Sequence, residues 1–228
     1  MIAMSKMNKF NKYLTILNDL YEESKDIFNL LKKKNNSIIY CCIIITSNKG
    51  LCGSINNEIL KKSLNFIKNY NCDIILIGKK SIDFFEKKNI LIKEKIIFKD
   101  NEKIKNIFFS NNILNNFKYY KNIFFFSSKY INNNIKIIQT KLFNNIKIIH
   151  YEIFNFDFNN YIKKFYNNVL KKIFIEHTFC ELKSRMITMK SAADNSKKLL
   201  KKMKIIKNKI RQFKVTQNML EIINGFNI

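Results

Sequence analysis

The sequence has no proline or tryptophan, only four glycines, and only two arginines among its 42 basic residues. The shortage of proline and glycine excludes collagen-like chains and proline-rich linkers. The five cysteines are odd in number and include no Cys-x-x-Cys pair, which argues against a disulfide framework and favours a reducing compartment. Every 18-residue window carries charge and residues 1–14 contain no apolar h-region, so we expect neither a transmembrane helix nor a secretory signal.

Four residue types dominate what is present. Ile (41), Lys (40), Asn (35) and Phe (21) account for 137 of the 228 residues, and all four have A/T-rich codons. A hydrophobic content of 46% is enough to bury a core. The net charge of +25 would normally indicate a polyanion partner. Because lysine and asparagine are the default polar residues here, the charge also fits a solvated surface, and a basic nucleic-acid-binding protein stays an alternative hypothesis.

The first 34 residues have the spacing of an amphipathic helix. Nine positions follow one another at alternating steps of four and three residues, and seven of them are large and apolar. Such a narrow stripe suits one partner helix better than a broad core. The positions are Ala3, Met7, Phe10, Leu14, Leu17, Tyr21, Ser24, Phe28 and Leu31.

The middle of the chain alternates between strand-like and helix-like segments. Residues 37–46 form an apolar, Ile-rich run that indicates a strand buried on both faces, as in a parallel sheet. The alternation predicts an α/β domain over about 37–153. Further strands are expected at 73–77, 95–98, 122–126, 135–142 and 146–153, and helices at 56–69 and 81–88.

From residue 157 the helical spacing returns and continues to Gly225, the one stop signal. A helix of some 68 residues would be roughly 100 Å long at 1.5 Å per residue, which calls for a coiled coil or rod. We therefore predict an α/β fold in which a long antiparallel coiled coil of the N- and C-terminal helices carries an inserted Rossmann-like domain. The expected boundaries are 1–36, 37–155 and 156–228.

The local motifs give little indication of catalysis. The loop S-N-K-G-L-C-G-S at 47–54 could cradle a phosphate, but it is neither Gly-x-Gly-x-x-Gly nor a Walker A loop, so a structural turn at Gly50 and Gly53 is preferred. His177 and Cys180 could belong to a metal site, yet His150 is the only other histidine and zinc needs three or four ligands. We predict no catalytic residue, metal or cofactor.

Four stretches, in order along the chain, resemble the gamma subunit of F-type ATP synthases. Residues 181–195 (ELKSRMITMKSAADN) are similar to the family's S-E-x-x-A-R-M-x-A-M-K-x-A-T-D-N, and 208–225 (NKIRQFKVTQNMLEIING) to its terminal N-K-x-R-Q-x-x-I-T-Q-E-L-x-E-I-x-x-G. Residues 45–53 (ITSNKGLCG) resemble I-T-S-D-[KR]-G-L-C-G, and 1–7 (MIAMSKM) resemble M-V-A-A-S-K-M. Both arginines of the chain, Arg185 and Arg211, lie in these motifs.

The resemblance implies a non-catalytic central stalk that rotates and couples proton flow to ATP synthesis on the beta subunits. Its implied partners are the alpha and beta subunits, the epsilon subunit and the ring of c subunits, with no nucleic acid. Its implied place is the cytoplasmic face of the bacterial inner membrane, reached only through the complex. Residues that match positions facing or coupling to the alpha/beta hexamer are Lys6, Met7, Lys9, Arg185, Lys190, Arg211, Gln212, Thr216, Gln217 and Glu221.

The sequence also departs from the family pattern. The family's N-terminal helix normally begins several turns before the position of Met1, so we expect either a shortened coil or a start assigned too late. Asn218, Leu220 and Phe226 replace residues of the terminal motif. These differences concern individual contacts at the far end of the long helix.

Overall fold

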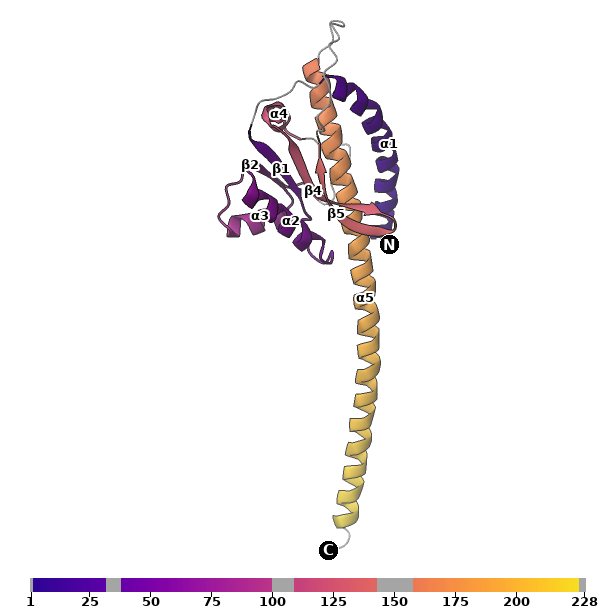
Figure 1. The fold of residues 1–228 in the computed structure, drawn as a ribbon. Coiled ribbons are helices and arrows are strands. Elements are labelled where there is room, and N and C mark those ends of the chain that lie inside the picture. The colour runs from indigo at the N-terminus through magenta and orange to yellow at the C-terminus, as the bar shows by residue number, and fades with distance from the viewer. Residues whose placement is uncertain (1, 32–37, 100–108, 143–157, 226–228) are drawn as a thin grey trace. The chain divides into compact units, whose positions relative to one another are not determined.

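The computed structural model describes residues 2–31, 38–99, 109–142 and 158–225. Helix α1 is Ile2–Leu31 and helix α5 is Phe158–Gly225, and between them lie β1 (Tyr40–Ile45), α2 (Ile55–Asn69), β2 (Cys72–Ile77), α3 (Lys79–Lys87), β3 (Glu94–Ile96), α4 (Asn111–Asn116), the short 3-10 helix η2 (Phe117–Tyr119), β4 (Ile123–Ile131) and β5 (Asn134–Lys141). The predicted fold class is confirmed (Figure 1). The strand predicted at 146–153 lies outside the described residues.

The five strands form one mixed sheet in the order β3-β2-β1-β4-β5. The first four are parallel, and β5 runs antiparallel to β4 at the edge. The β4–β5 turn consists of Asn132 and Asn133, both with positive φ, as a tight two-residue hairpin requires. Only residues 123–126 of β4 pair with β1, so the second half of β4 pairs with β5 alone.

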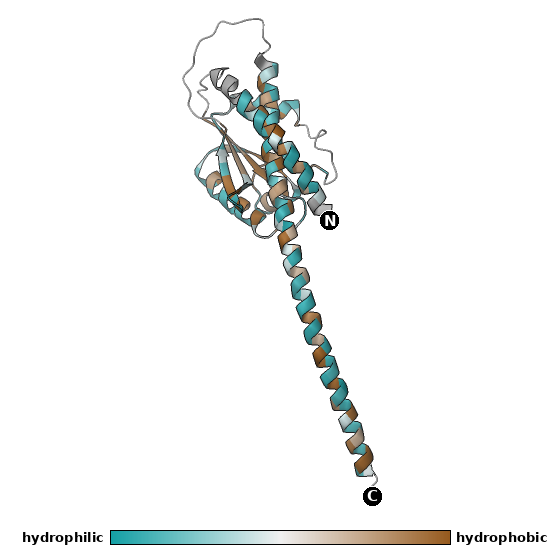
Figure 2. Cartoon of the chain, turned by 90° about the vertical axis from the view of Figure 1, so that its right-hand side faces the viewer, coloured by the Kyte–Doolittle hydropathy of each residue, from teal (hydrophilic) through white to brown (hydrophobic). Residues whose placement is uncertain are grey.

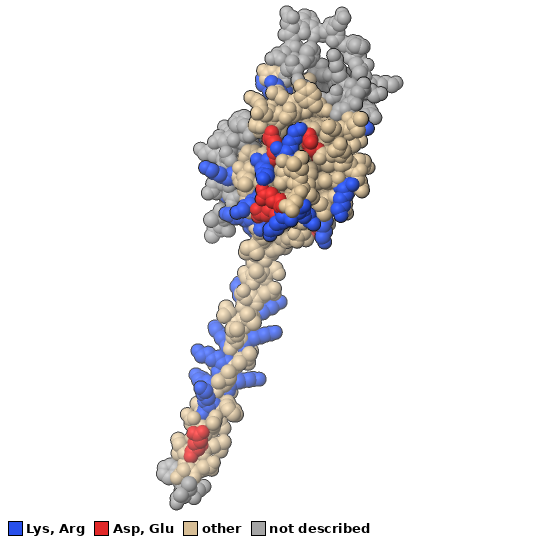
Figure 3. Space-filling model, turned by 90° about the vertical axis from the view of Figure 1, so that its left-hand side faces the viewer, with Lys and Arg blue, Asp and Glu red and all other residues tan. Residues whose placement is uncertain are grey.

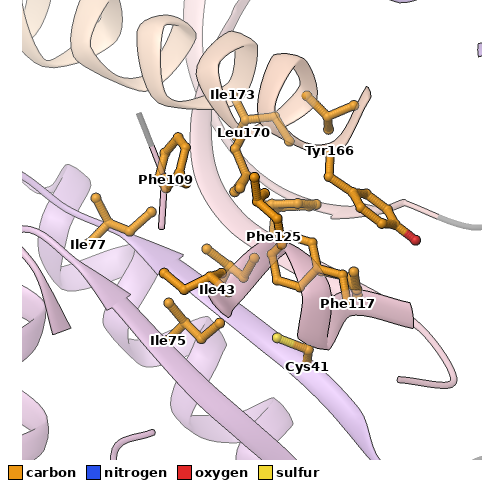
Figure 4. Close-up of a cluster of buried hydrophobic side chains, with 14 of the residues drawn as sticks. Cys41, Ile43, Ile75, Ile77, Phe109, Phe117, Phe125, Tyr166, Leu170 and Ile173 are labelled. Atoms are coloured by element: carbon orange, nitrogen blue, oxygen red, sulfur yellow. The ribbon is translucent and has the colours of Figure 1, made fainter. Parts of the chain in front are cut away.

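Both faces of the sheet are covered, because each inner strand is apolar at successive positions. Odd-numbered strand residues such as Ile43 and Phe125 pack with α4, η2 and the first part of α5, where Leu170 and Ile173 contribute (Figure 4). Even-numbered residues such as Ile44 pack against α2 and α3. This layering places α5 directly on the sheet.

Helix α1 confirms the predicted seam. Of its nine positions, the six with described side chains are all buried or half-buried. Most other positions on this part of the helix are exposed. The six are Met7, Phe10, Leu14, Leu17, Tyr21 and Ser24.

Contacts divide the chain into two units, residues 1–186 and 187–228. The division falls within α5, so the first 29 residues of that helix, 158–186, belong to the unit that contains the sheet. Residues 187–225 form the second unit and consist of helix alone.

Candidate functional site

The glycine-containing loop 47–54 connects β1 to α2 and is held by side chains from its own ends. Asn56 Nδ2 donates to Ser47 Oγ (2.7 Å) and to Cys52 Sγ (3.1 Å), while Asn56 Oδ1 accepts from the Ser47 amide (3.2 Å). Leu51 (φ 65°) and Gly53 (φ 66°) are left-handed, a conformation that leucine rarely adopts. Leu51 is also 70% exposed, so the loop presents an apolar side chain at a strained position.

Helix α5 fixes the other side of this loop. Ser184 Oγ donates to the Cys52 carbonyl (2.7 Å), and Arg185 Nη2 donates to the Gly50 carbonyl (3.4 Å). The same guanidinium nitrogen is paired with Glu181 Oε1 at 2.5 Å. Two motifs that are more than 130 residues apart in sequence therefore form a single structure, which we call the loop–helix clamp: Gly50, Cys52, Glu181, Ser184 and Arg185.

The clamp offers no phosphate cradle among the described residues. The contacts to α5 use loop carbonyls, which repel anions. The neighbouring helix α3 has its first amides taken: Lys79 N–H donates to Asn48 Oδ1 and Ser81 N–H to Thr46 Oγ1. A helix N-terminus binds anions through such amides only while they lack other partners.

Helix α1 runs antiparallel to the first part of α5. Tyr161 Oη donates to the Ser24 carbonyl (3.2 Å), and the Tyr21 ring stacks on Phe165 at 6.3 Å between centroids. Lys172 Nζ lies 3.9 Å from the centroid of Tyr21, close enough for a cation–π interaction. As residue numbers fall along α1 they rise along α5, which is the predicted antiparallel arrangement.

Three predicted contact residues lie near the start of α1. Lys6 and Met7 are half-buried, whereas Lys9 is exposed. Their positions on the first turns leave the Lys9 side chain open to another molecule. Of the predicted residues on α5, only Arg185 belongs to the same unit, and the structure joins it to Gly50 rather than to these lysines.

The second unit is a helix with no core of its own. Every residue from 187 to 225 is exposed except Thr188, which is half-buried. Apolar and polar residues alternate along it (Figure 2). Large apolar side chains that are more than half exposed include Leu199, Leu200, Met203, Ile206, Ile210, Phe213 and Leu220. So many exposed apolar groups on one element indicate a surface that another molecule covers.

The remaining predicted contact residues all lie on this exposed helix. Lys190, Arg211 and Gln212 are exposed, as are Thr216, Gln217 and Glu221. The printed contacts of the last three stay within the helix: Thr216 Oγ1 donates to the Gln212 carbonyl (2.9 Å) and Gln217 Nε2 to Glu221 Oε1 (3.3 Å). Lysines and one arginine occupy much of its surface (Figure 3), with ten basic and two acidic residues between 187 and 225.

His177 and Cys180, the pair considered for a metal, lie buried where α5 meets β4. His177 Nδ1 is 2.9 Å from Ser128 Oγ and accepts from the Ser128 amide (3.4 Å). Burial lowers the pKa of His177 to about 4 and raises the pKa of the Cys180 thiol to about 11, so both are neutral near pH 7. Within the described ranges no three His, Cys, Asp or Glu side chains gather as metal ligands would.

The lowered pKa of His177 predicts a pH dependence of stability. Between the folded value of about 4 and the ordinary 6.5, the unfolded chain binds more protons, so acidification favours unfolding. The stabilisation is complete above pH 6.5 and is lost as the pH falls through 4, by up to about 3 kcal/mol at 1.36 kcal/mol per pKa unit. Urea unfolding at pH 7 and pH 4.5 should show this loss in the wild type and a smaller one in His177→Asn, in which every carboxylate titrates as before.

Sequence reasoning missed three features of this region. Nothing in the sequence marked Ser184 as a ligand of the Cys52 carbonyl, or Ser128 as the partner of His177. The short helix α4 was also missed, although Ser110 caps it by accepting from Ile113 N–H in the usual N-cap manner. Serine is common in loops as well as caps, so its presence alone could not have located these contacts.

Known proteins resemble this chain over most of its length. A family model described as ATP synthase matches residues 1–227. The ATP synthase gamma chain of Buchnera aphidicola subsp. Melaphis rhois is 30% identical, covering 98% of this chain and 86% of the relative, and that of subsp. Schlechtendalia chinensis is 31% identical, covering 80% and 71%. Among solved structures, the central stalk/c-ring of the Tetrahymena thermophila mitochondrial ATP synthase matches with a TM-score of 0.66 at 17% identity, covering 85% of this chain and 96% of that one. At that identity the structural match supports the fold alone.

Proposed function

The chain belongs to the ATP synthase gamma-chain family, and on that premise we propose which of its surfaces carry the function. It is the non-catalytic rotor subunit of the central stalk, which couples proton flow to ATP synthesis at sites on other subunits. The observation that carries our proposal is the exposed apolar seam of residues 187–225, since a helix without a core of its own requires a partner to cover it.

We assign the alpha and beta subunits as the partner that covers the second unit. The charge supports this assignment, because ten basic residues against two acidic ones suit an acidic surrounding surface. Lys190, Arg211, Gln212, Thr216, Gln217 and Glu221 are then contact residues with the hexamer. On α1, Lys6, Met7 and Lys9 extend the same contact.

The unit that contains the sheet is then the part that meets the epsilon subunit and the ring of c subunits. None of the described helices is both long and apolar enough to cross a membrane. The chain therefore joins a membrane-associated complex through its partners, and we place it on the cytoplasmic face of the bacterial inner membrane.

Nothing in the comparisons supports the alternative of a nucleic-acid-binding protein. That alternative predicts a DNA or RNA affinity that falls steeply with salt and survives competitor. A salt-titrated filter-binding assay on the purified chain distinguishes the two, and we expect only weak binding that competitor polyanions remove.

Co-assembly tests the proposed function. The chain should be purified together with its cognate alpha and beta subunits and should raise their ATP hydrolysis, whereas a chain truncated after residue 186 should retain the sheet but assemble poorly. The truncated form is a fair control because residues 1–186 constitute one compact unit. Full assembly by the truncated chain would overturn the proposal that 187–225 is the contact surface.

The two arginines should respond differently to removal of their side chains. Arg185→Ala breaks the contacts to Gly50 and Glu181, and we expect a loss of about 1 kcal/mol in unfolding free energy after allowance for partial exposure. Arg211→Ala removes an exposed side chain on the second unit, so stability should stay within about 0.5 kcal/mol while coupling falls. Chemical denaturation measures the first effect and ATP-driven proton pumping the second; equal stability of the two variants would contradict the role of the clamp.

A further inference from the structure

A small cavity lies inside the first unit, at the edge of the sheet where the parallel strands end. Its volume is about 70 Å³. Thr46, Ser47 and Asn48 line it after β1, and Gly78 lines it after β2. Helices α1 and α5 complete its wall, with Phe10 from α1 and with Phe174, His177, Thr178 and Glu181 from α5. The cavity therefore lies where both terminal helices meet the sheet.

The imidazole of His177 contributes a hydrogen-bond donor that lacks a protein acceptor. The Ser128 amide donates to Nδ1, so that nitrogen carries no proton and the neutral ring must be protonated at Nε2. His177 is 0% exposed, and Nε2 has no hydrogen-bond partner among the described residues. A buried donor without an acceptor is costly, and native proteins rarely leave one in that state.

The other cavity groups indicate a ligand that both accepts and donates. The Thr178 hydroxyl donates to the Phe174 carbonyl (2.8 Å), so its oxygen can still accept. The Glu181 carboxylate accepts hydrogen bonds and disfavours an anion. The nearby α3 amides that would hold an oxyanion already donate to Asn48 and Thr46. Water fits this mixture, and a cavity of 70 Å³ exceeds the space that one water molecule needs.

We propose that this cavity is a hydration site, in which His177 Nε2–H donates to an ordered water that links α5 to the carboxyl edge of the sheet. The water would satisfy the buried donor and use Thr178 or Glu181 as a second partner, giving it the two to four contacts that buried waters usually have. His177 then has two separate roles: Nδ1 anchors Ser128 of β4, and Nε2 holds the water.

Two substitutions separate these roles in the full chain. Asparagine can place its Oδ1 near the position of Nδ1 but does not reach Nε2, whereas glutamine can reach Nε2 and does not mimic Nδ1. We expect His177→Asn to keep the Ser128 contact and lose the water, and His177→Gln to keep a donor to the water and lose the Ser128 contact.

A density map of the assembled complex, at a resolution that shows ordered waters, provides the test. The proposal predicts a peak about 2.7–3.2 Å from Nε2 in the wild type, its loss in His177→Asn and its retention in His177→Gln. A dry cavity in the wild type, a protein acceptor on Nε2, or a bound ion in place of water would each overturn it. Nitrogen-15 NMR of the labelled histidine is a second, independent readout: a proton on Nδ1 instead of Nε2 would also refute the proposal.

Discussion

Gly78→Ala should destabilise the chain more than any other addition of a single methyl group at its described glycines. Gly78 joins β2 to α3 with φ at +99°, and an added Cβ would lie 2.0 Å from the Thr46 carbonyl oxygen. The left-handed backbone costs about 1–3 kcal/mol for a non-glycine residue, and the steric overlap adds about 1–3 kcal/mol. Together these approach the 5–15 kcal/mol of stability that a typical domain has. Thermal or urea unfolding, or simple recovery of soluble protein, measures the effect.

Gly50→Ala is the matched control. A Cβ at Gly50 would meet no atom within 4 Å, and the Gly50 carbonyl remains available to Arg185. We expect a change within about 0.5 kcal/mol, as for an ordinary surface substitution. If the two variants unfolded at similar denaturant concentrations, the close approach between the β1 and β2 ends would not be a determinant of this fold.

Ile210→Asp should impair assembly and coupling while leaving the fold of the first unit intact. Ile210 is 53% exposed and lies on the apolar seam of the second unit. Once a partner covers the seam, a carboxylate there is desolvated without a counter-charge, which typically costs at least about 2 kcal/mol, or a factor of about 30 in affinity. Affinity for the alpha/beta assembly and ATP-driven proton pumping should both fall accordingly.

Asn208→Asp is the control for this substitution. Residues 208 and 210 are two positions apart, so they point to roughly opposite sides of the helix. The same carboxylate on the polar side should leave binding within a factor of about three, or roughly 0.7 kcal/mol. Equal losses in the two variants would mean that added negative charge, and not burial of the seam, explains the effect.

Periodicity was a reliable guide where one face of an element determines its role. The alternating steps of four and three predicted which α1 side chains would be protected, from Met7 to Ser24, because helix geometry fixes which residues share a face. The apolar runs predicted the inner strands of the parallel sheet for a similar reason. The β4 strand was underestimated, since its polar second half, Ser127–Ile131, pairs with β5 and leaves the apolar pattern.

The contacts of the clamp could not be read from spacing. The sequence singled out Arg185 because arginine is so rare, but it did not indicate that the guanidinium reaches Gly50. That contact depends on how α5 packs across the sheet, which brings together residues more than 130 positions apart. The functional assignment of Arg185 to the hexamer stays a prediction, and its contact with the loop suggests that it acts through the shape of that loop.

Observation of rotation tests the central claim most directly. The assembled complex would be fixed through its alpha and beta subunits, with a visible probe attached to Leu91→Cys, a position that is 91% exposed. Four of the five native cysteines are buried, so the chain without the added thiol controls for labelling elsewhere. The account predicts continuous, unidirectional rotation of the probe in ATP. A probe that stays still while the same complexes hydrolyse ATP would contradict it.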